Sequence, residues 1–170
     1  RLDGQTIILV DVSGSMDDAL SKKSTMKRLD AACAIAMIAR ELCDGDVVRH
    51  SPFTFTFSNQ LFQIPPRRGF ALRDAIVKSQ PHGGTSLSDA ISHINTLVLK
   101  DRDYRSMRLI VITDEQANSA VPNPIVPAYM INVAPYRNGV GYNGNWIHID
   151  GFSESVLDYI FEYELLQKSE

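Results

Sequence analysis

Residues 6–16 read TIILVDVSGSM. The stretch opens with a mostly apolar run rich in β-branched side chains, which is typical of a strand covered on both faces in a parallel sheet. Directly behind this run, Asp11, Ser13 and Ser15 place one carboxylate and two hydroxyls at alternate positions. A buried strand that ends in three oxygen-bearing side chains predicts a polar site at its carboxyl end.

The rest of the chain alternates between strand and helix patterns. A second apolar run, 109–112, is followed by Thr113 and Asp114. The alternating segment 53–57 and the short run 61–64, which ends in two prolines, predict an antiparallel hairpin at a sheet edge. The further predicted elements are helices over 26–42, 70–79, 86–100 and from Ser153 onward, strands over 128–133 and 146–149, and a glycine-rich loop over 136–145. Asp89, three residues after Ser86, predicts a capping pair at the third helix.

This order of elements predicts the fold class and the place of the site. Strands that alternate with helices around two central apolar strands indicate an α/β fold with a doubly wound, mostly parallel sheet. Ligands bind such sheets at the carboxyl ends of the strands, where the strand order reverses. We therefore expect Asp11 and Asp114, each directly behind a central strand, to face the same crevice.

Composition narrows the class of protein. The 170 residues suffice for one domain with its own core, and the net charge of −3 argues against a nucleic-acid binder that acts alone. No segment approaches the roughly 18 consecutive apolar residues of a membrane span. The two cysteines, Cys33 and Cys43, lie on or at the end of an apolar helix and no glycosylation sequon is present, so we expect reduced thiols and a cytoplasmic protein. From the length we expect a single domain over 1–170. Because the chain starts at Arg1 and not at Met, we expect it to be a piece of a longer protein.

The oxygen-bearing side chains predict a hard metal ion. Two carboxylates in one crevice repel each other, and a divalent cation resolves that conflict. Hydroxyls join them at the same edge: Ser13 and Ser15, then Thr85 after Gly83-Gly84, and Thr113 beside Asp114. Gly14 is expected to let the backbone bend between the two serines. Oxygen-only ligation without His or Cys favours Mg²⁺ and disfavours zinc.

The three motifs D-x-S-G-S, G-G-T and an apolar strand ending in T-D, in this order, resemble the metal-ion-dependent adhesion site of von Willebrand factor type A domains. The resemblance implies a Rossmann-like sheet with helices on both faces and Mg²⁺ or Mn²⁺ at its top. It implies that Ser13 and Ser15 bind the metal directly, Thr85 directly or through water, and Asp11 and Asp114 mostly through water. The remaining position is open to an acidic group of a partner protein, so the site is not an enzyme's.

Further stretches, DVSGSM, PHGGTSLSDAI, RLIVITDEQ and INVAPYRNGVGYNGNWIHIDGFSESVLDYI, resemble the C-terminal domain of Ro/TROVE proteins, in particular bacterial ones. These proteins carry an N-terminal ring of helical repeats that binds small noncoding RNA. The resemblance implies RNA binding for the parent protein, through a part outside this sequence.

Two other functions stay open. Phosphohydrolases of the haloacid dehalogenase class place a nucleophilic Asp where Asp11 stands, but they need a second Asp two positions on, and position 13 is Ser. Alternatively, the domain is a structural module with a vestigial metal site. The basic residues Lys22, Lys23, Lys27 and Arg28 are expected to form a solvated face, and His82 to lie at the rim of the site without binding metal.

Overall fold

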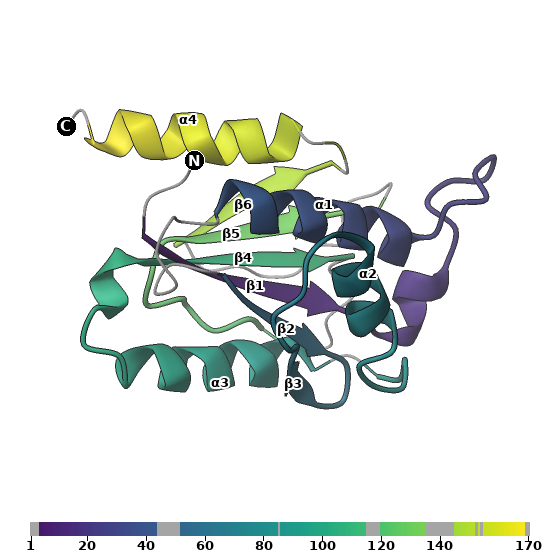
Figure 1. Cartoon of the computed structure of the whole chain (residues 1–170), viewed down its shortest axis with the longest axis horizontal. Helices are drawn as coiled ribbons and strands as arrows, with labels where there is room; N and C mark the ends of the chain where they lie inside the picture. Colours follow the sequence, from purple (N-terminus) through teal and green to yellow (C-terminus); the bar gives the residue numbers. More distant parts are fainter. Residues whose placement is uncertain are drawn as a thin grey trace.

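The computed structural model describes residues 4–43, 52–84, 86–114, 120–134, 145–151, 153 and 155–168. These residues contain a six-stranded sheet of order β3-β2-β1-β4-β5-β6 (Figure 1). Its strands are β1 (Gln5–Asp11), β2 (Phe53–Phe57), β3 (Leu61–Gln63), β4 (Met107–Thr113), β5 (Ala128–Asn132) and β6 (Trp146–Asp150). Only the β2–β3 pair is antiparallel within this sheet. The predicted mostly parallel sheet with an antiparallel edge hairpin is confirmed.

The strand order reverses between β1 and β4. The chain leaves β1 for β2 on one side and returns to β4 on the other, and β1 and β4 are parallel neighbours with Val10 beside Ile112. All residues of both strands are buried, as their apolar composition predicts. The carboxyl ends of β1 and β4 therefore flank the point where the loops diverge and where α/β sheets bind ligands.

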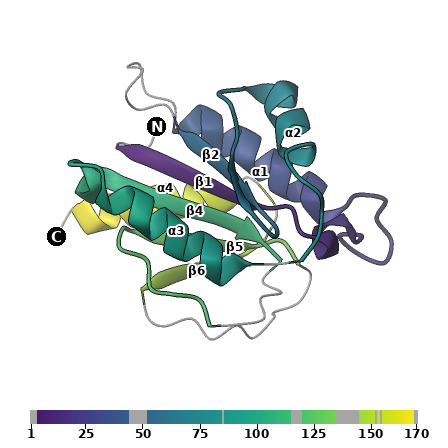
Figure 2. The same cartoon turned by 90° about the horizontal axis from the view of Figure 1, so that it is seen from below.

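Helices cover both faces of the sheet, as Figures 1 and 2 show. The alternation of side chains along β1 sends Ile8 and Val10 into one core and Ile7 and Leu9 into another. The first core is closed by α1 (Arg28–Leu42), α2 (Gly69–Val77) and α4 (Ser155–Lys168), and the second by α3 (Leu87–Leu99) and by the segment around Val121 and Val126. Two short 3₁₀ helices, η1 (Gly14–Asp17) and η3 (Tyr104–Ser106), precede α1 and β4.

Two details of the helices differ from the sequence-based expectations. The first helix begins at Arg28, two residues later than predicted. Ser86 does precede α3, but its side chain makes no capping hydrogen bond, so the predicted capping pair with Asp89 is wrong. The Ser86 N–H donates to the Ser58 carbonyl, 3.1 Å away, and its ψ of 54° departs from the extended backbone that a capping residue normally adopts. Of the predicted loop over 136–145, only Asn145 lies within the described residues.

No helix within the described ranges combines the length and the apolar character needed to cross a membrane. Both cysteines are buried free thiols, as predicted. Burial, helped by the negative charge of Asp30 and opposed by Arg73, raises the pKa of the Cys33 thiol to about 12. Cys33 is therefore an inert core residue at neutral pH.

The core on the α3 side gives a direct test of the fold. Ile91→Ala removes a fully buried side chain that packs against the sheet. We expect it to lower the free energy of unfolding by roughly 2–5 kcal/mol, because the lost apolar contacts leave a cavity. Leu99→Ala, on the same helix but 59% exposed, should cost less than about 0.5 kcal/mol. Equal losses in urea unfolding would contradict the placement of α3.

Candidate metal site

Asp11, the last residue of β1, is fully buried and bonded through both carboxylate oxygens. Oδ1 accepts a hydrogen bond from the Ser13 N–H at 2.8 Å, and Oδ2 accepts one from the Thr113 hydroxyl at 2.7 Å. The first bond turns the chain back over the end of its own strand, and the second ties β1 to β4. Asp11 is thereby fixed at the carboxyl edge of the sheet.

The loop after β1 brings Ser13 and Ser15 together. Their hydroxyl oxygens lie 3.4 Å apart, with Ser13 buried and Ser15 partly exposed. The turn between them is the 3₁₀ helix η1, in which the Met16 N–H donates to the Ser13 carbonyl at 3.0 Å. Gly14 needs no left-handed backbone here, and a Cβ on it would come no closer than 3.4 Å to a neighbouring atom. The expected reliance on Gly14 for a sharp bend is therefore wrong.

The loop that carries Gly83 and Gly84 is held against the same edge by the end of β2. The Ser58 hydroxyl accepts from the Gly83 N–H at 2.9 Å and donates to the Gly84 carbonyl at 2.8 Å. The Gly14 N–H also donates to the Gly83 carbonyl at 2.8 Å, which joins this loop to η1. A Cβ on either glycine would come within 2.7 or 2.8 Å of the amide group of Asn59, an exposed side chain that can move aside. Thr85, the next residue, lies outside the described residues.

Asp114 follows β4 directly and is fully buried. Its Oδ2 forms an ion pair with the Nη1 of Arg28, 3.0 Å away. Arg28 is the first residue of α1 and is only 5% exposed, so its predicted place on a solvated face is wrong. Lys22, Lys23 and Lys27 are exposed as expected. The sequence gives one usable signal for Arg28, because a cation in the first turn opposes the helix dipole.

The two carboxylates share one electrostatic environment. Burial and the negative charge of Asp114 raise the pKa of Asp11 to about 6, although the hydrogen bonds from Ser13 and Thr113 act in the opposite direction. Asp11 and Asp114 therefore lie close enough to repel each other, as the sequence predicted. A cation in this crevice stabilises the charged form of both.

The described side chains fit a small divalent cation. The available donors are hydroxyl and carboxylate oxygens, and no group of three or more His, Cys, Asp or Glu residues gathers anywhere in the described part of the chain. Two adjacent ligands of an octahedral ion at 2.1 Å lie about 3 Å apart, close to the 3.4 Å between the two serine hydroxyls. The Arg28 guanidinium is already a cation bound to one of the carboxylates. The oxygen donors therefore suit a small divalent cation, whereas the ion pair between Arg28 and Asp114 opposes a second cation.

His82 links η1 to α2 and is not oriented as a metal ligand. Its Nδ1 lies 2.8 Å from Asp17 Oδ2 and its Nε2 lies 2.8 Å from the Val77 carbonyl oxygen. A carboxylate and a carbonyl only accept hydrogen bonds, so both contacts are satisfied when both ring nitrogens carry a proton. Partial burial lowers the pKa of His82, and Lys27 acts in the same direction, but the bonds to Asp17 and Val77 outweigh them and the net pKa is raised.

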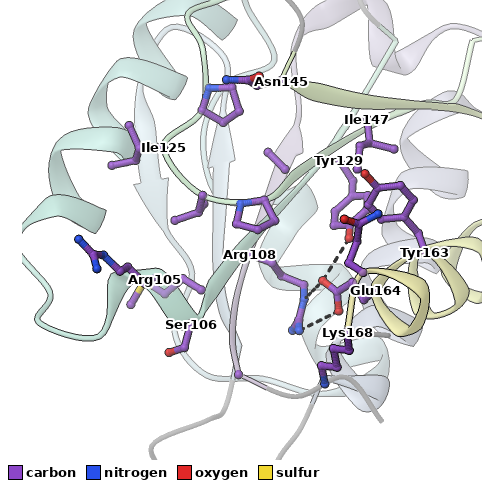
Figure 3. A pocket seen from close by; sticks show the side chains of 17 residues that line it. Arg105, Ser106, Arg108, Ile125, Tyr129, Asn145, Ile147, Tyr163, Glu164 and Lys168 are labelled. Carbon is purple, nitrogen blue, oxygen red and sulfur yellow. Dashed lines mark hydrogen bonds and ion pairs between the residues drawn. The ribbon is translucent and has the colours of Figure 1, made fainter. Parts of the chain in front are cut away.

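A cavity at the opposite edge of the sheet does not contain the predicted site residues. It has a volume of about 730 Å³ and is bounded by the amino ends of β4 and β5 and by α4 (Figure 3). Arg108 donates to both carboxylate oxygens of Glu164 at 2.7 and 3.0 Å, and the Tyr129 hydroxyl donates to the same carboxylate at 3.1 Å. Burial and the charge of Glu164 raise the pKa of Tyr129, which keeps this hydroxyl a donor. These groups bond to one another and connect α4 to the sheet.

The His82 bridge predicts a pH-dependent contribution to stability. Because the folded protein raises the pKa of His82, the bridge stabilises the fold below the ordinary His pKa of about 6.5 and loses this effect as pH rises through the folded value. His82→Asn should therefore lower the urea unfolding free energy more at pH 5.5 than at pH 8.5. His93→Asn, at an exposed position of α3, is the matched control. A loss in His82→Asn that is equal at both pH values would contradict the charged bridge.

Solved structures of similar fold include the Ro (RSR) protein of Deinococcus radiodurans, with a TM-score of 0.63 and 18% identity over 91% of this chain. The chain spans 33% of the length of that protein. The conserved hypothetical protein BatB of Bacteroides thetaiotaomicron has a TM-score of 0.61 and 15% identity over 99% of this chain and 100% of its own. A von Willebrand factor type A protein of Catenulispora acidiphila has a TM-score of 0.58 and 14% identity over 95% of this chain and 42% of its own. At these identities the likeness is one of fold.

No curated protein sequence shows significant similarity to the chain. Residues 6–116, well over half of the chain, match the sequence profile of the von Willebrand factor type A domain. The matched range runs from β1 through Asp114 and therefore includes all three motifs of the predicted site. The chain belongs to the von Willebrand factor type A domain family.

Proposed function

We propose that the chain is a divalent-metal-dependent protein-binding module. Mg²⁺, or Mn²⁺, is held at the carboxyl edge of the sheet, and one coordination position is open to an acidic group of a partner protein. The proposal is supported by the two serine hydroxyls that lie 3.4 Å apart at the carboxyl edge of the sheet, and by the charge of Asp114, which helps to raise the pKa of the buried Asp11.

The contacts of these side chains suggest which of them would bind the metal directly and which through water. Ser13 and Ser15 would bind the metal directly, and Thr85 directly or through water. Asp11 would act through water, since both of its carboxylate oxygens already accept hydrogen bonds from Ser13 and Thr113. Asp114 would do the same, because Arg28 holds one of its oxygens.

Neutral ligands explain why an acidic partner is favoured. A bound Mg²⁺ supplies Lewis-acid attraction for one more oxygen ligand. When hydroxyls and waters contact the ion directly and the carboxylates contact it only through water, little of its charge is neutralised. An Asp or Glu side chain of a partner then completes the coordination.

We further propose that the parent protein is a Ro/TROVE-type ribonucleoprotein of the cytoplasm. The similarity in fold to the Deinococcus Ro protein, of which this chain spans 33%, supports a longer parent. RNA would bind through the part outside this chain, whose net charge of −3 disfavours phosphate binding. Two buried free thiols are consistent with a reducing compartment.

Catalysis is not part of this proposal. Ser13 stands where a phosphohydrolase of the haloacid dehalogenase class needs an acid, and it is buried with its N–H bonded to Asp11. We therefore expect no phosphate release from p-nitrophenyl phosphate in the presence of Mg²⁺. Turnover that disappears in Asp11→Asn would instead establish an enzyme.

Metal binding is tested by calorimetric titration of Mg²⁺ and Mn²⁺ into metal-stripped protein. We expect one saturable site in the wild type and a loss of affinity of at least about tenfold in Ser13→Ala and in Asp11→Ala, because a ligand and a water-holding carboxylate are removed. Ser21→Ala, at an exposed position beyond η1, should bind as the wild type does.

The same titration separates the protein-binding module from a structural module with a vestigial site. If the wild type binds no more tightly than Ser13→Ala and Asp11→Ala, the metal-dependent function is wrong. A bound metal should also raise the melting temperature of the wild type, since an ion that binds only the folded state stabilises it.

A further inference from the structure

Arg28 is a buried cation that pairs with Asp114 at the candidate metal site and belongs to none of the three motifs of that site. Its guanidinium lies 3.0 Å from Asp114, and both side chains are almost completely shielded from water. Removing two charges from water is costly, and Arg28 also stands in the first turn of α1, where the helix dipole disfavours a cation. The attraction between Arg28 and the Asp114 carboxylate opposes both costs.

The backbone around Arg28 keeps it at this place. The Arg28 N–H donates to the Asp18 carbonyl at 3.0 Å, and Asp18 directly follows η1. The Leu20 N–H donates to the Met26 carbonyl at 2.7 Å, so the chain between η1 and α1 doubles back on itself. The Asp30 carboxylate accepts from the Lys27 N–H at 2.8 Å and fixes the start of the helix. The beginning of α1 is therefore anchored to the loop that carries Ser13 and Ser15.

This geometry has an electrostatic consequence for the metal. A guanidinium bound to Asp114 neutralises one of the two carboxylates that attract the ion, and it repels a second cation in the same buried crevice. Salt screens such a buried pair only weakly, so the effect persists at physiological ionic strength.

We propose that Arg28 is a built-in competitor of the divalent metal, which weakens metal binding by holding Asp114 in an ion pair. The inference rests on the proposed function. It makes Arg28 a residue that tunes metal affinity, although it is not a metal ligand. Metal and guanidinium share the negative charge of Asp114, and binding the metal loosens the ion pair.

The test compares wild type with Arg28→Gln and Arg28→Lys in calorimetric titrations of Mg²⁺ and Mn²⁺. Gln removes the charge but keeps an N–H group that can reach towards Asp114. It therefore separates the competition of the positive charge with the metal from the positioning of Asp114 by a hydrogen bond. We expect the dissociation constant of Arg28→Gln to fall by at least about tenfold, and that of Arg28→Lys to stay within about threefold of the wild type.

A matched control lies on the same helix. Arg40 is also buried and stands twelve residues, or about 18 Å, further along α1. Arg40→Gln should leave the metal affinity unchanged. An equal gain in Arg40→Gln would attribute the effect to overall charge and overturn the proposal.

The outcomes separate this inference from the proposed function. If the wild type binds metal and Arg28→Gln binds equally or more weakly, Arg28 does not compete and only the inference fails. If the wild type does not bind but Arg28→Gln does, the inference holds and the metal-dependent function of the wild type fails. If neither protein binds, both fail.

Arg28→Met covers the case in which the Gln variant does not fold. Circular dichroism with and without Mg²⁺ then gives the answer. Variants that fold only with Mg²⁺ support the proposal, because the metal replaces the missing cation. Variants that stay unfolded with Mg²⁺ overturn it, because the guanidinium then has a structural role that the metal cannot take over.

Discussion

The parallel pairing of β1 with β4 is the contact on which the proposed site depends. The register that puts Val10 beside Ile112 also brings Asp11 and Thr113 within hydrogen-bonding distance and places Asp114 one residue beyond. A shift of one residue would move each side chain of the shifted strand from one core to the other and disrupt the packing of both. The same apolar packing that selects the register of the sheet therefore fixes the distance between the two carboxylates.

This pairing places the carboxylates of Asp11 and Asp114 where water has little access. Each carboxylate is stabilised by different hydrogen-bond donors. Asp11 receives a backbone N–H and a hydroxyl, whereas Asp114 receives a full positive charge from Arg28. The neutral donors leave the pKa of Asp11 raised, because burial and Asp114 outweigh them. Charge compensation in the crevice is thus uneven, and Asp11 is the carboxylate with more to gain from a metal.

The features predicted from the sequence depend on residues close together in the chain, whereas the features it missed depend on residues far apart. β1 and β4 are readable because a strand buried on both faces is apolar throughout, and Asp11, Ser13 and Asp114 follow from their positions at strand ends. Arg28 lies 86 positions from Asp114, and its basic neighbours are exposed, so composition indicates a solvated face. The prediction for Ser86 is wrong for the same reason, since its N–H donates to the carbonyl of Ser58, the residue directly after β2. Local patterns identify the candidate ligands, but long-range contacts decide the charge around them.

The charge around the candidate ligands bears on what the proposed site is suited to bind. A crevice that bound metal as tightly as possible would present bare carboxylates and exclude other cations. Here Asp11 accepts hydrogen bonds from a hydroxyl and an N–H, and Asp114 is paired with a guanidinium. The groups left to contact an ion directly are the uncharged hydroxyls of Ser13 and Ser15. In the proposed function this weakens the hold on the ion and preserves its positive charge. That combination favours an acidic partner over an ion held for structure alone, because the incoming carboxylate supplies the neutralisation that the protein withholds.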